Sequence, residues 1–269
     1  MRKKLDLEVI ELGIGIPFMD SPTEKINFKT SYLFTHSDER WNTKPDRQSF
    51  FKEKIEMDLH CISHVDSINH RAQNMVGFKD LKYEEDPSTY RNGADTTPTI
   101  KGNALMLDFP KYMKADFLEE EGEISVELIE KCLDFQCTSI DDYKIILIRT
   151  GHIMHWKSGE YDKYFEKEVG LNVEAITWLA EKDIVAVGAD NFAVESIPTK
   201  ENSYSTFYPG HKKFLGEKGI YIIENLDLDV LSLRNINEFY FIAAPIRFKN
   251  ASAALINPVA IVDTNESGG

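Results

Sequence analysis

The sequence predicts an α/β fold built on a mixed or parallel sheet, chiefly because of the order of its apolar segments. Short apolar runs typical of buried strands alternate with segments of helical periodicity between residues 104 and 223. With 269 residues, 42% of them hydrophobic and 28% charged, the chain has the composition of a globular protein with a sizeable core. No glycine-rich fingerprint for a dinucleotide or a phosphate group accompanies these strands, which argues against a Rossmann-type cofactor.

The expected elements follow the apolar runs in chain order. Strands are expected at residues 5–12, 104–108, 143–149, 184–188, 219–223, 238–247 and 253–262. One helix is expected around residues 124–133 with Ser125 as a possible cap, and a second runs from an Asn172 cap through Lys182. Residues 28–46 show no clear period. We find no internal repeat and no linker, so residues 1–269 are expected to form a single domain.

The charge balance narrows the class of partner. A net charge of −14 argues against nucleic acid or an anionic membrane surface as a partner. No segment approaches the length of a membrane span, and the N-terminus lacks the apolar run of a signal peptide. The cysteines form neither an even disulfide framework nor a C-x-x-C pair, so a reduced, cytoplasmic setting is expected.

Residues 58–70 carry the clearest functional signal. Three of the seven histidines fall here with an aspartate, in the spacing His60-x3-His64-x-Asp66-x3-His70. Any one histidine alone is more often a core or surface residue, but three with an aspartate in eleven residues are not expected by chance. Imidazole and carboxylate together suit Zn²⁺ or Mn²⁺. The stretch therefore predicts a divalent metal site.

The same spacing limits the local structure. On an α-helix His60 and His64 share a face, but Asp66 lies about 240° round the axis from His60. In a straight strand the side chains share a face, but His60 and His64 are about 13 Å apart. The arrangement that uses every ligand is a strand that ends near His60 and bends into a loop through Ser63 to His70. The long polar region at residues 71–99 follows, and it could form one wall of a pocket.

The histidine–aspartate motif resembles the defining motif of the cyclase family of metal-dependent hydrolases. That family includes bacterial kynurenine formamidase, isatin hydrolase and trans-dienelactone hydrolase. Further similar segments follow in the same order along the chain, at residues 104–108, 147–151, 188–195, 209–211 and 222–226. The resemblance covers roughly residues 55 to 262.

The resemblance implies a swivelling β/β/α fold, a homo-oligomer (dimer or tetramer) and a Zn²⁺ or Mn²⁺ centre. Carried over by position, His60, His64 and Asp66 are the primary metal ligands. His211 and Glu224 then complete the centre or bind a second ion bridged by Asp66. Taken singly, His211 also suits a surface position and Glu224 a solvated strand end, and composition does not decide between these interpretations.

In such a family member His70 is the general acid/base and not a ligand. A divalent ion activates water for attack on a carbonyl carbon, and an imidazole moves a proton to the leaving nitrogen or oxygen. The resemblance thus implies a hydrolase of a small amide, lactone or cyclic-amide carbonyl. The alternatives are a biosynthetic cyclase or dehydratase, or a member that binds metal or a small molecule without hydrolysis. His70 favours an enzyme, because a structural metal site needs no free base.

Several positions depart from the family pattern. Ile62-Ser63 replaces a glycine-threonine pair, and His152 stands where an aromatic residue is usual. Residues 250–254 replace a glycine-rich turn. The Asp-Ala-Pro typical of formamidases is Asp66-Ser67-Ile68, which favours a lactone or a cyclic amide over formylkynurenine as the substrate. The metal ligands are unaffected, and the substrate-binding residues stay unknown.

Overall fold

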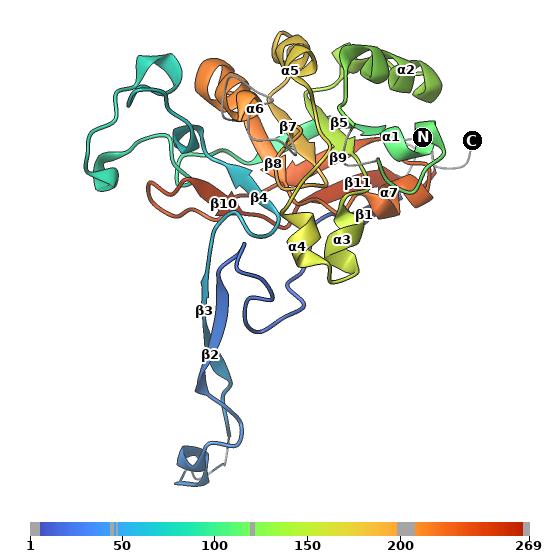
Figure 1. Cartoon of the computed structure of the whole chain (residues 1–269). Helices are drawn as coiled ribbons and strands as arrows, with labels where there is room; N and C mark the ends of the chain where they lie inside the picture. Colours follow the sequence, from blue (N-terminus) through green and yellow to red (C-terminus); the bar gives the residue numbers. More distant parts are fainter. Residues whose placement is uncertain (1–5, 44–45, 47, 119–121, 198–207, 266–269) are drawn as a thin grey trace, which may run out of the picture.

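The computed structural model describes residues 6–43, 46, 48–118, 122–197 and 208–265. Its centre is a mixed sheet in the order β1-β11-β9-β5-β6-β7-β8-β4-β10 (Figure 1). Four parallel strands form the middle of this sheet: β5 (Ile100–Asp108), β6 (Ile145–Arg149), β7 (Ala186–Ala189) and β8 (Tyr221–Glu224). The predicted α/β class with a mixed sheet is confirmed.

Antiparallel strands extend the sheet on both sides. They are β9 (Glu238–Ala243), β11 (Val259–Asp263) and β1 (Leu7–Glu11) beyond β5, and β4 (His64–Asp66) and β10 (Ala253–Leu255) beyond β8. The single strand predicted at residues 253–262 is wrong, because its two halves pair with different neighbours. Pro258 separates them, and proline cannot donate a ladder hydrogen bond. The strand predicted at residues 238–247 likewise ends early, at Ala243, two residues before Pro245.

The split strand shows how the sheet is curled. β10 forms one edge and β11 lies next to the other edge, yet only three residues separate Leu255 from Val259. An extended chain advances at most about 3.6 Å per residue, so the two ends of the sheet approach each other within about 15 Å. The sheet therefore curls toward closure, which brings β4 and β8 close to the start of the chain, as the Gly13–Leu226 bridge shows.

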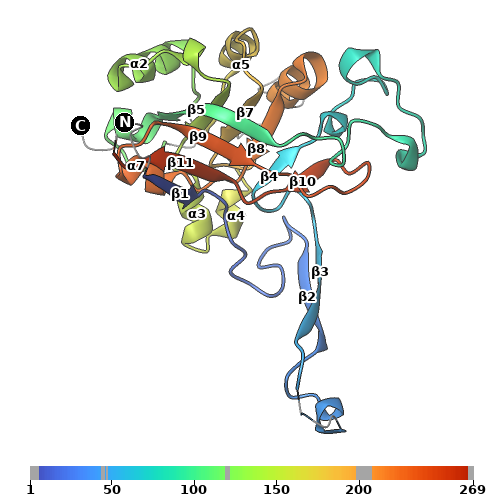
Figure 2. The same ribbon diagram turned by 180° about the vertical axis from the view of Figure 1, so that it is seen from behind.

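The helices are short and cover both faces of the sheet (Figures 1 and 2). They are α1 (Phe109–Met113), α2 (Val126–Gln136), α3 (Ile153–Lys157), α4 (Tyr161–Tyr164), α5 (Val173–Ala180), α6 (Pro209–His211), a π-helix at Lys212–Lys218, and α7 (Asp229–Leu233). Both predicted caps are confirmed: Ser125 accepts a hydrogen bond from the Leu128 amide and Asn172 from the Ala175 amide. Helix α5 ends at Ala180, two residues before the predicted end. Among the described residues, no helix has the length and apolar character needed to cross a membrane.

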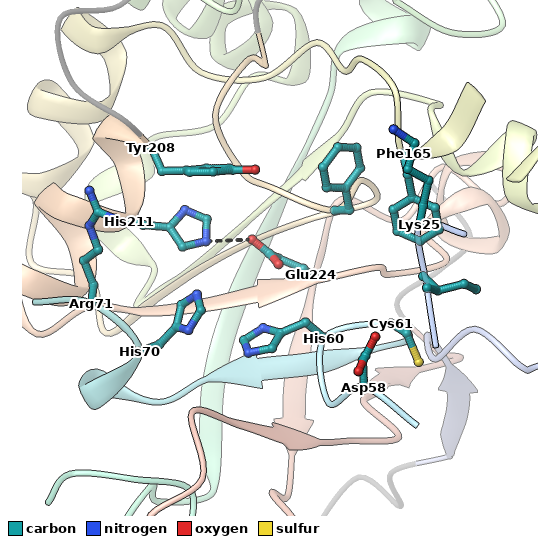
Figure 3. Close-up of a pocket in the computed structure, with 12 residues that line it drawn as sticks. Lys25, Asp58, His60, Cys61, His70, Arg71, Phe165, Tyr208, His211 and Glu224 are labelled. Carbon is teal, nitrogen blue, oxygen red and sulfur yellow. Dashed lines mark ion pairs between the residues drawn. The ribbon is translucent and has the colours of Figure 1, made fainter. Parts of the chain in front are cut away.

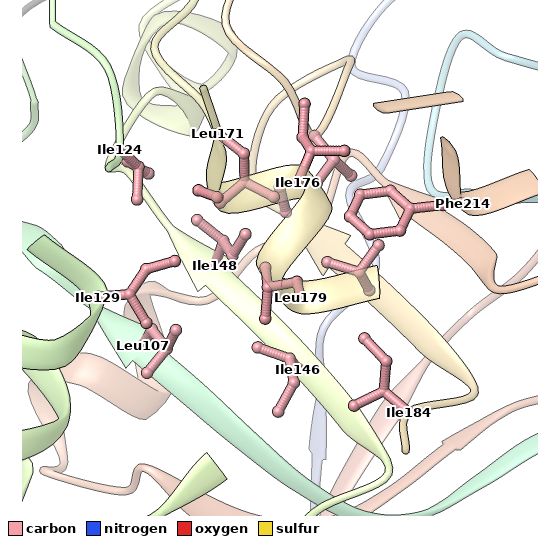
Figure 4. Packing of buried hydrophobic residues seen from close by; sticks show 14 of the residues in the cluster. Leu107, Ile124, Ile129, Ile146, Ile148, Leu171, Ile176, Leu179, Ile184 and Phe214 are labelled. Carbon is pink, nitrogen blue, oxygen red and sulfur yellow. The ribbon is translucent and has the colours of Figure 1, made fainter. Parts of the chain in front are cut away.

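Alternate residues of the central strands pack into two separate hydrophobic cores, one on each face of the sheet. Leu105 and Leu107 of β5 face the cluster beneath α2 and α5 (Figure 4), whereas Ala104 and Met106 face the cluster on the other side of the sheet. Because both faces are covered, residues 104–107 of β5 and 145–148 of β6 are all apolar. This is why the sequence revealed these two strands so clearly.

Strands β2 (Phe28–Phe34) and β3 (Lys52–Met57) form a separate two-stranded arm that projects from the body (Figures 1 and 2). The strand predicted to end near His60 therefore ends at Met57. β2 lies in the region where the sequence showed no period. Much of the arm is exposed to solvent, including the large side chains of Tyr32 and Ile55, and no apolar alternation marks β2.

The core predicts a specific stability difference between two leucines. Leu107 is 0% exposed and Leu233 is 83% exposed. We expect Leu107→Ala to lower the free energy of unfolding by about 2–5 kcal/mol, because it removes buried methyl groups and leaves a cavity. Leu233→Ala should change it by less than about 0.5 kcal/mol. Urea denaturation of both variants measures the difference, and equal losses would contradict the assignment of Leu107 to the core.

Candidate metal centre

Strand β4 and the turn before it present the first group of ligand-type side chains. His60 lies in the turn that follows β3, and His64 and Asp66 lie on β4. Residues two apart in a strand point to the same face, so His64 and Asp66 share a direction. The loop predicted from Ser63 to His70 is thus wrong for residues 64–66, which pair with β8 and β10 on either side.

The sheet brings Glu224 to the same place. In the β4–β8 ladder His64 is the direct partner of Glu224, and cross-strand partners place their side chains on one face. His64 Nε2 lies 3.1 Å from Glu224 Oε2. His211 arrives from the junction of α6 and the π-helix, with its Nε2 3.3 Å from Asp66 Oδ2 and 3.4 Å from Glu224 Oε1. The π-helix that follows His211 and then strand β8 bring both side chains back to Asp66.

The ligand atoms fall into two sets that share the two carboxylates. In the first set, His60 Nδ1 and His64 Nε2 lie 3.0 and 3.3 Å from Asp66 Oδ1. In the second set, His211 Nε2 faces the other oxygen of Asp66 and one oxygen of Glu224. Ligands at 2.0–2.2 Å from a tetrahedral ion are about 3.4 Å from one another. The first set therefore suits one divalent ion. A second position lies at Asp66 and His211, which form a group with His70 whose ligand atoms lie within 4.8 Å of one another.

Three carboxylate oxygens in this centre accept no hydrogen bond from any described residue. They are Asp66 Oδ1, Asp66 Oδ2 and Glu224 Oε1, and all three are buried. A buried acceptor without a donor is costly, and a carboxylate more so than a neutral group. A cation removes that cost, so the residues present fit a metal ion.

The outward-facing nitrogens of the imidazoles are occupied. The Nδ1 of His64 lies 2.7 Å from the Ile62 carbonyl oxygen, and the Nε2 of His60 lies 3.1 Å from Ser252 Oγ. The Nδ1 of His211 lies 2.9 Å from Glu195 Oε1. An imidazole that donates its proton outward presents a lone pair inward, which is the tautomer a metal ligand needs.

The centre attracts positive charge strongly. Burial disfavours the charged form of His64, but Asp66 and Glu224 outweigh it and raise the pKa of His64 to about 10. Burial likewise opposes the charge on His211, yet Glu195 and Asp66 raise the pKa of that imidazole well above its usual value. Burial, with the charge of Asp66 added, raises the pKa of Glu224. A site that holds protons so firmly also favours a divalent cation, which displaces them.

His70 differs from the other three imidazoles. Its side chain is 32% exposed, and its Nε2 lies 3.9 Å from Asp66 Oδ2. Burial and the neighbouring imidazoles lower the pKa of His70 to about 4, although the Asp66 charge opposes them. It is therefore neutral at pH 7 and able to accept a proton. One nitrogen of His70 also lies within 4.8 Å of ligand atoms of Asp66 and His211, so the geometry admits coordination as well.

Comparison with known protein families identifies the family of this chain. The family model for putative cyclases matches residues 13–196, about two thirds of the chain. The chain belongs to the cyclase family. The matched region contains His60, His64, Asp66 and His70, but it ends before His211 and Glu224. No curated protein matches this sequence.

Solved structures share the cyclase-family fold at low sequence identity. A structure described as a novel cyclase has a TM-score of 0.79 and 20% identity over 94% of this chain and 88% of its own. Isatin hydrolase A from Ralstonia solanacearum has a TM-score of 0.70 and 16% identity over 95% of this chain and 92% of its own. A predicted metal-dependent hydrolase from Bacillus stearothermophilus has a TM-score of 0.59 and 18% identity over 95% and 98%. The swivelling β/β/α architecture expected from the resemblance is thus the fold of this family member.

A cavity of about 460 Å³ opens over the candidate metal centre of this cyclase-family protein (Figure 3). Besides the histidines and Glu224, its lining includes the aromatic side chains of Phe165, Phe192 and Tyr208 and the cationic side chains of Lys25 and Arg71. Sequence reasoning named none of these five as site residues. Their local signals are that Arg71 directly follows His70, that Tyr208 precedes the 209–211 segment, and that Phe192 lies within the 188–195 segment. Within the polar region 71–99, Arg71 alone lines this cavity.

Asn225, the residue after β8, holds in place the turn at residues 58–63, which carries His60 and is called the ligand turn below. Its side-chain nitrogen donates to the Ile62 carbonyl at 3.1 Å, and its side-chain oxygen accepts from the buried Tyr164 hydroxyl at 2.8 Å. The Ser63 hydroxyl donates to the Asn225 carbonyl at 2.5 Å and accepts from the Ile14 amide at 2.8 Å. The departure from the family pattern at Ser63 therefore supports the turn that carries His60.

The departure at His152 lies away from the ligands. Its Nε2 bonds the Tyr164 carbonyl oxygen at 2.9 Å, and its ring stacks on Tyr164 with centroids 5.1 Å apart. Burial lowers the pKa of His152 to about 4, so the ring is a neutral packing group. Among the described residues that line the cavity, His152 does not appear.

The centre predicts the metal content of the protein. We expect the purified chain to carry about one or two divalent ions. His64→Ala should lower that number, because His64 Nε2 faces both Asp66 and Glu224. Elemental analysis after dialysis measures the content. His36→Ala, which removes an exposed imidazole on the distant arm, is the matched control and should retain the wild-type content. Equal metal in wild type and His64→Ala would place the ions elsewhere.

Proposed function

We propose that this protein is a metal-dependent hydrolase that opens a small amide, lactone or cyclic-amide carbonyl. The observation that carries the proposal is the pair of ligand sets at the floor of a cavity, with a neutral imidazole beside them. A structural metal site needs neither the cavity nor the free base. Membership in the cyclase family, and similarity to structures described as isatin hydrolases, support the same reaction class.

The proposed ligands are His60, His64 and Asp66, with His211 and Glu224 facing the second ion position. The residue types suit Zn²⁺ or Mn²⁺. A bound divalent ion lowers the pKa of water toward neutrality and polarises a carbonyl group. Asp66 and Glu224 supply the negative charge that retains the ion, and their burial keeps water from screening it.

His70 is the proposed general acid/base. Its neutral imidazole faces the cavity next to Asp66, where it can take a proton from attacking water and return it to the leaving nitrogen or oxygen. Asp66 Oδ2, 3.9 Å away, favours the transient imidazolium. The proton thus passes between the substrate and a side chain that returns to its neutral form.

The cavity favours a small, flat substrate. Its volume of about 460 Å³ lies in the range of small-molecule sites. In Figure 3, Tyr208 and Phe165 lie across the site from His60 and His70, so that side of the cavity offers aromatic surface to a planar ring. A cyclic amide or a lactone matches this shape better than a long chain does.

A direct test is a panel of lactones, formamides and cyclic imides, assayed with metal-free protein and with added Mn²⁺ or Zn²⁺. Hydrolysis that depends on the added ion supports the proposal. Protein that binds metal but hydrolyses no member of the panel would favour one of the non-hydrolytic alternatives.

The role of His70 predicts a separation between metal binding and rate. We expect His70→Ala to retain its metal and to lose about 10²- to 10⁴-fold in kcat, because proton transfer loses its positioned group. Elemental analysis and steady-state kinetics measure the two effects, and His36→Ala serves again as the control. If His70→Ala loses metal and excess ion restores its activity, His70 belongs to the ligands.

A further inference from the structure

Glu195 is a buried acid that the proposed reaction leaves without a role. It follows β7 and is 1% exposed, behind His211 as seen from Asp66. Both of its carboxylate oxygens face His211 Nδ1, at 2.9 and 3.1 Å, and the His211 amide nitrogen lies 3.3 Å from the nearer one. The carboxylate thus holds both the ring and the backbone of His211.

The surrounding backbone fixes Glu195 closely. Leu171 pairs with it in a parallel bridge, and a Cβ added at Gly170 would lie 2.5 Å from the Glu195 carbonyl carbon. On the other side, a Cβ added at Gly210 would collide with the Glu195 carboxylate. Gly170 therefore allows the close approach of the Glu195 backbone, and Gly210 leaves space for its carboxylate. Such confinement gives the carboxylate one position relative to His211.

The three inward-facing imidazoles differ in what holds their outer nitrogens. His64 is held by a backbone carbonyl and His60 by the hydroxyl of Ser252, and both partners are uncharged. Of these three described imidazoles, only His211 is held by a carboxylate, Glu195. A carboxylate behind a histidine ligand fixes its tautomer and raises its basicity. The second ligand set therefore has an electrostatic support that the first set lacks.

We infer that Glu195 is a positioning residue that sets the affinity of the ion held by His211. The inference rests on the proposed metal centre and assigns an additional role within it. Glu195 orients Nε2 toward Asp66 and Glu224, and its charge strengthens His211 as a ligand. The ion of the first set, between His60 and His64, does not depend on it.

The test is a metal titration that requires no substrate. Calorimetric titration of Mn²⁺ into metal-free wild type should show two binding steps. In Glu195→Gln, which retains the shape of the side chain and removes its charge, we expect the weaker dissociation constant to rise about 10- to 100-fold. The tighter constant should stay as in wild type. Electron paramagnetic resonance should show the coupled signal of a manganese pair in wild type and an isolated six-line signal in the variant.

Glu168→Gln is the matched control. Glu168 is also fully buried, and its carboxylate accepts a hydrogen bond from the Phe192 amide at 2.9 Å. Its carboxylate bonds a backbone amide and not an imidazole, so both manganese constants should persist in Glu168→Gln. Glu195→Asp retains the charge at a greater distance. It should recover part of the lost affinity, and it provides the measurement if Glu195→Gln does not fold.

Other results overturn the inference in distinguishable ways. If Glu195→Gln binds manganese with the two dissociation constants of the wild type, Glu195 has no influence on the ion. Equal weakening of both constants would make it a general structural residue, as would equal weakening in Glu168→Gln. A wild type that binds a single ion would remove the second set. A wild type that binds no ion would instead overturn the proposed function itself.

Discussion

Asp66 and Glu224 place two carboxylates on one face of the β4–β8 ladder, fully out of water and without enough donors to satisfy them. Isolated buried charges of this kind cost several kcal/mol each, so the fold tolerates them only if cations meet them. The imidazoles around them serve that purpose by binding either protons or metal. Much of the surrounding architecture, from the ligand turn to the π-helix that begins after His211, positions these imidazoles.

Pairing between distant parts of the chain is what makes the arrangement possible. The proposed ligands come from three separate parts of the chain, and the β4–β8 ladder and the π-helix bring them together. Asn225 then joins the end of β8 to the turn that carries His60. A π-helix is rare in proteins and is often found at functional sites, and here it places His211 at its start. The centre is thus a product of long-range pairing and not of one local motif.

Much of this could be predicted from the sequence where the signal is local. The local order of residues is enough to predict the buried strands β5 and β6 and the two helix caps. It is also enough to mark the histidine–aspartate stretch. His211 and Glu224 were identified only through the family resemblance, because a single histidine or glutamate has no distinctive local pattern. The structure places both beside Asp66, while their role as ligands stays a prediction. The homo-oligomer and the cytoplasmic setting also stay predictions.

The elements and contacts that the sequence did not predict were missed for physical reasons. β2 has solvent around much of it, so its residues show no alternation that a reader of the sequence could detect. The break between β10 and β11 depends on where each half finds its partner, which Pro258 permits but does not determine. Glu195 lay in a segment that the resemblance marked, yet nothing in the sequence says which distant side chain it contacts. Partners separated by sixteen residues, as Glu195 and His211 are, become visible only when the chain is folded.

The arm of β2 and β3 has a consequence for local stability. A two-stranded sheet without a second layer is marginally stable in water, so its amide protons should exchange through local fraying. β3 ends three residues before His60, and Asn27 and Asp58 join the base of the arm with hydrogen bonds of 3.0 and 2.9 Å. Beyond that base, Asn225 and the sheet hold the ligand turn. Amide protons there should exchange with solvent only when the sheet itself opens. The arm, which opens readily, and the ligand turn, which opens rarely, thus meet within a few residues. The arm can fray while the ligands stay in place.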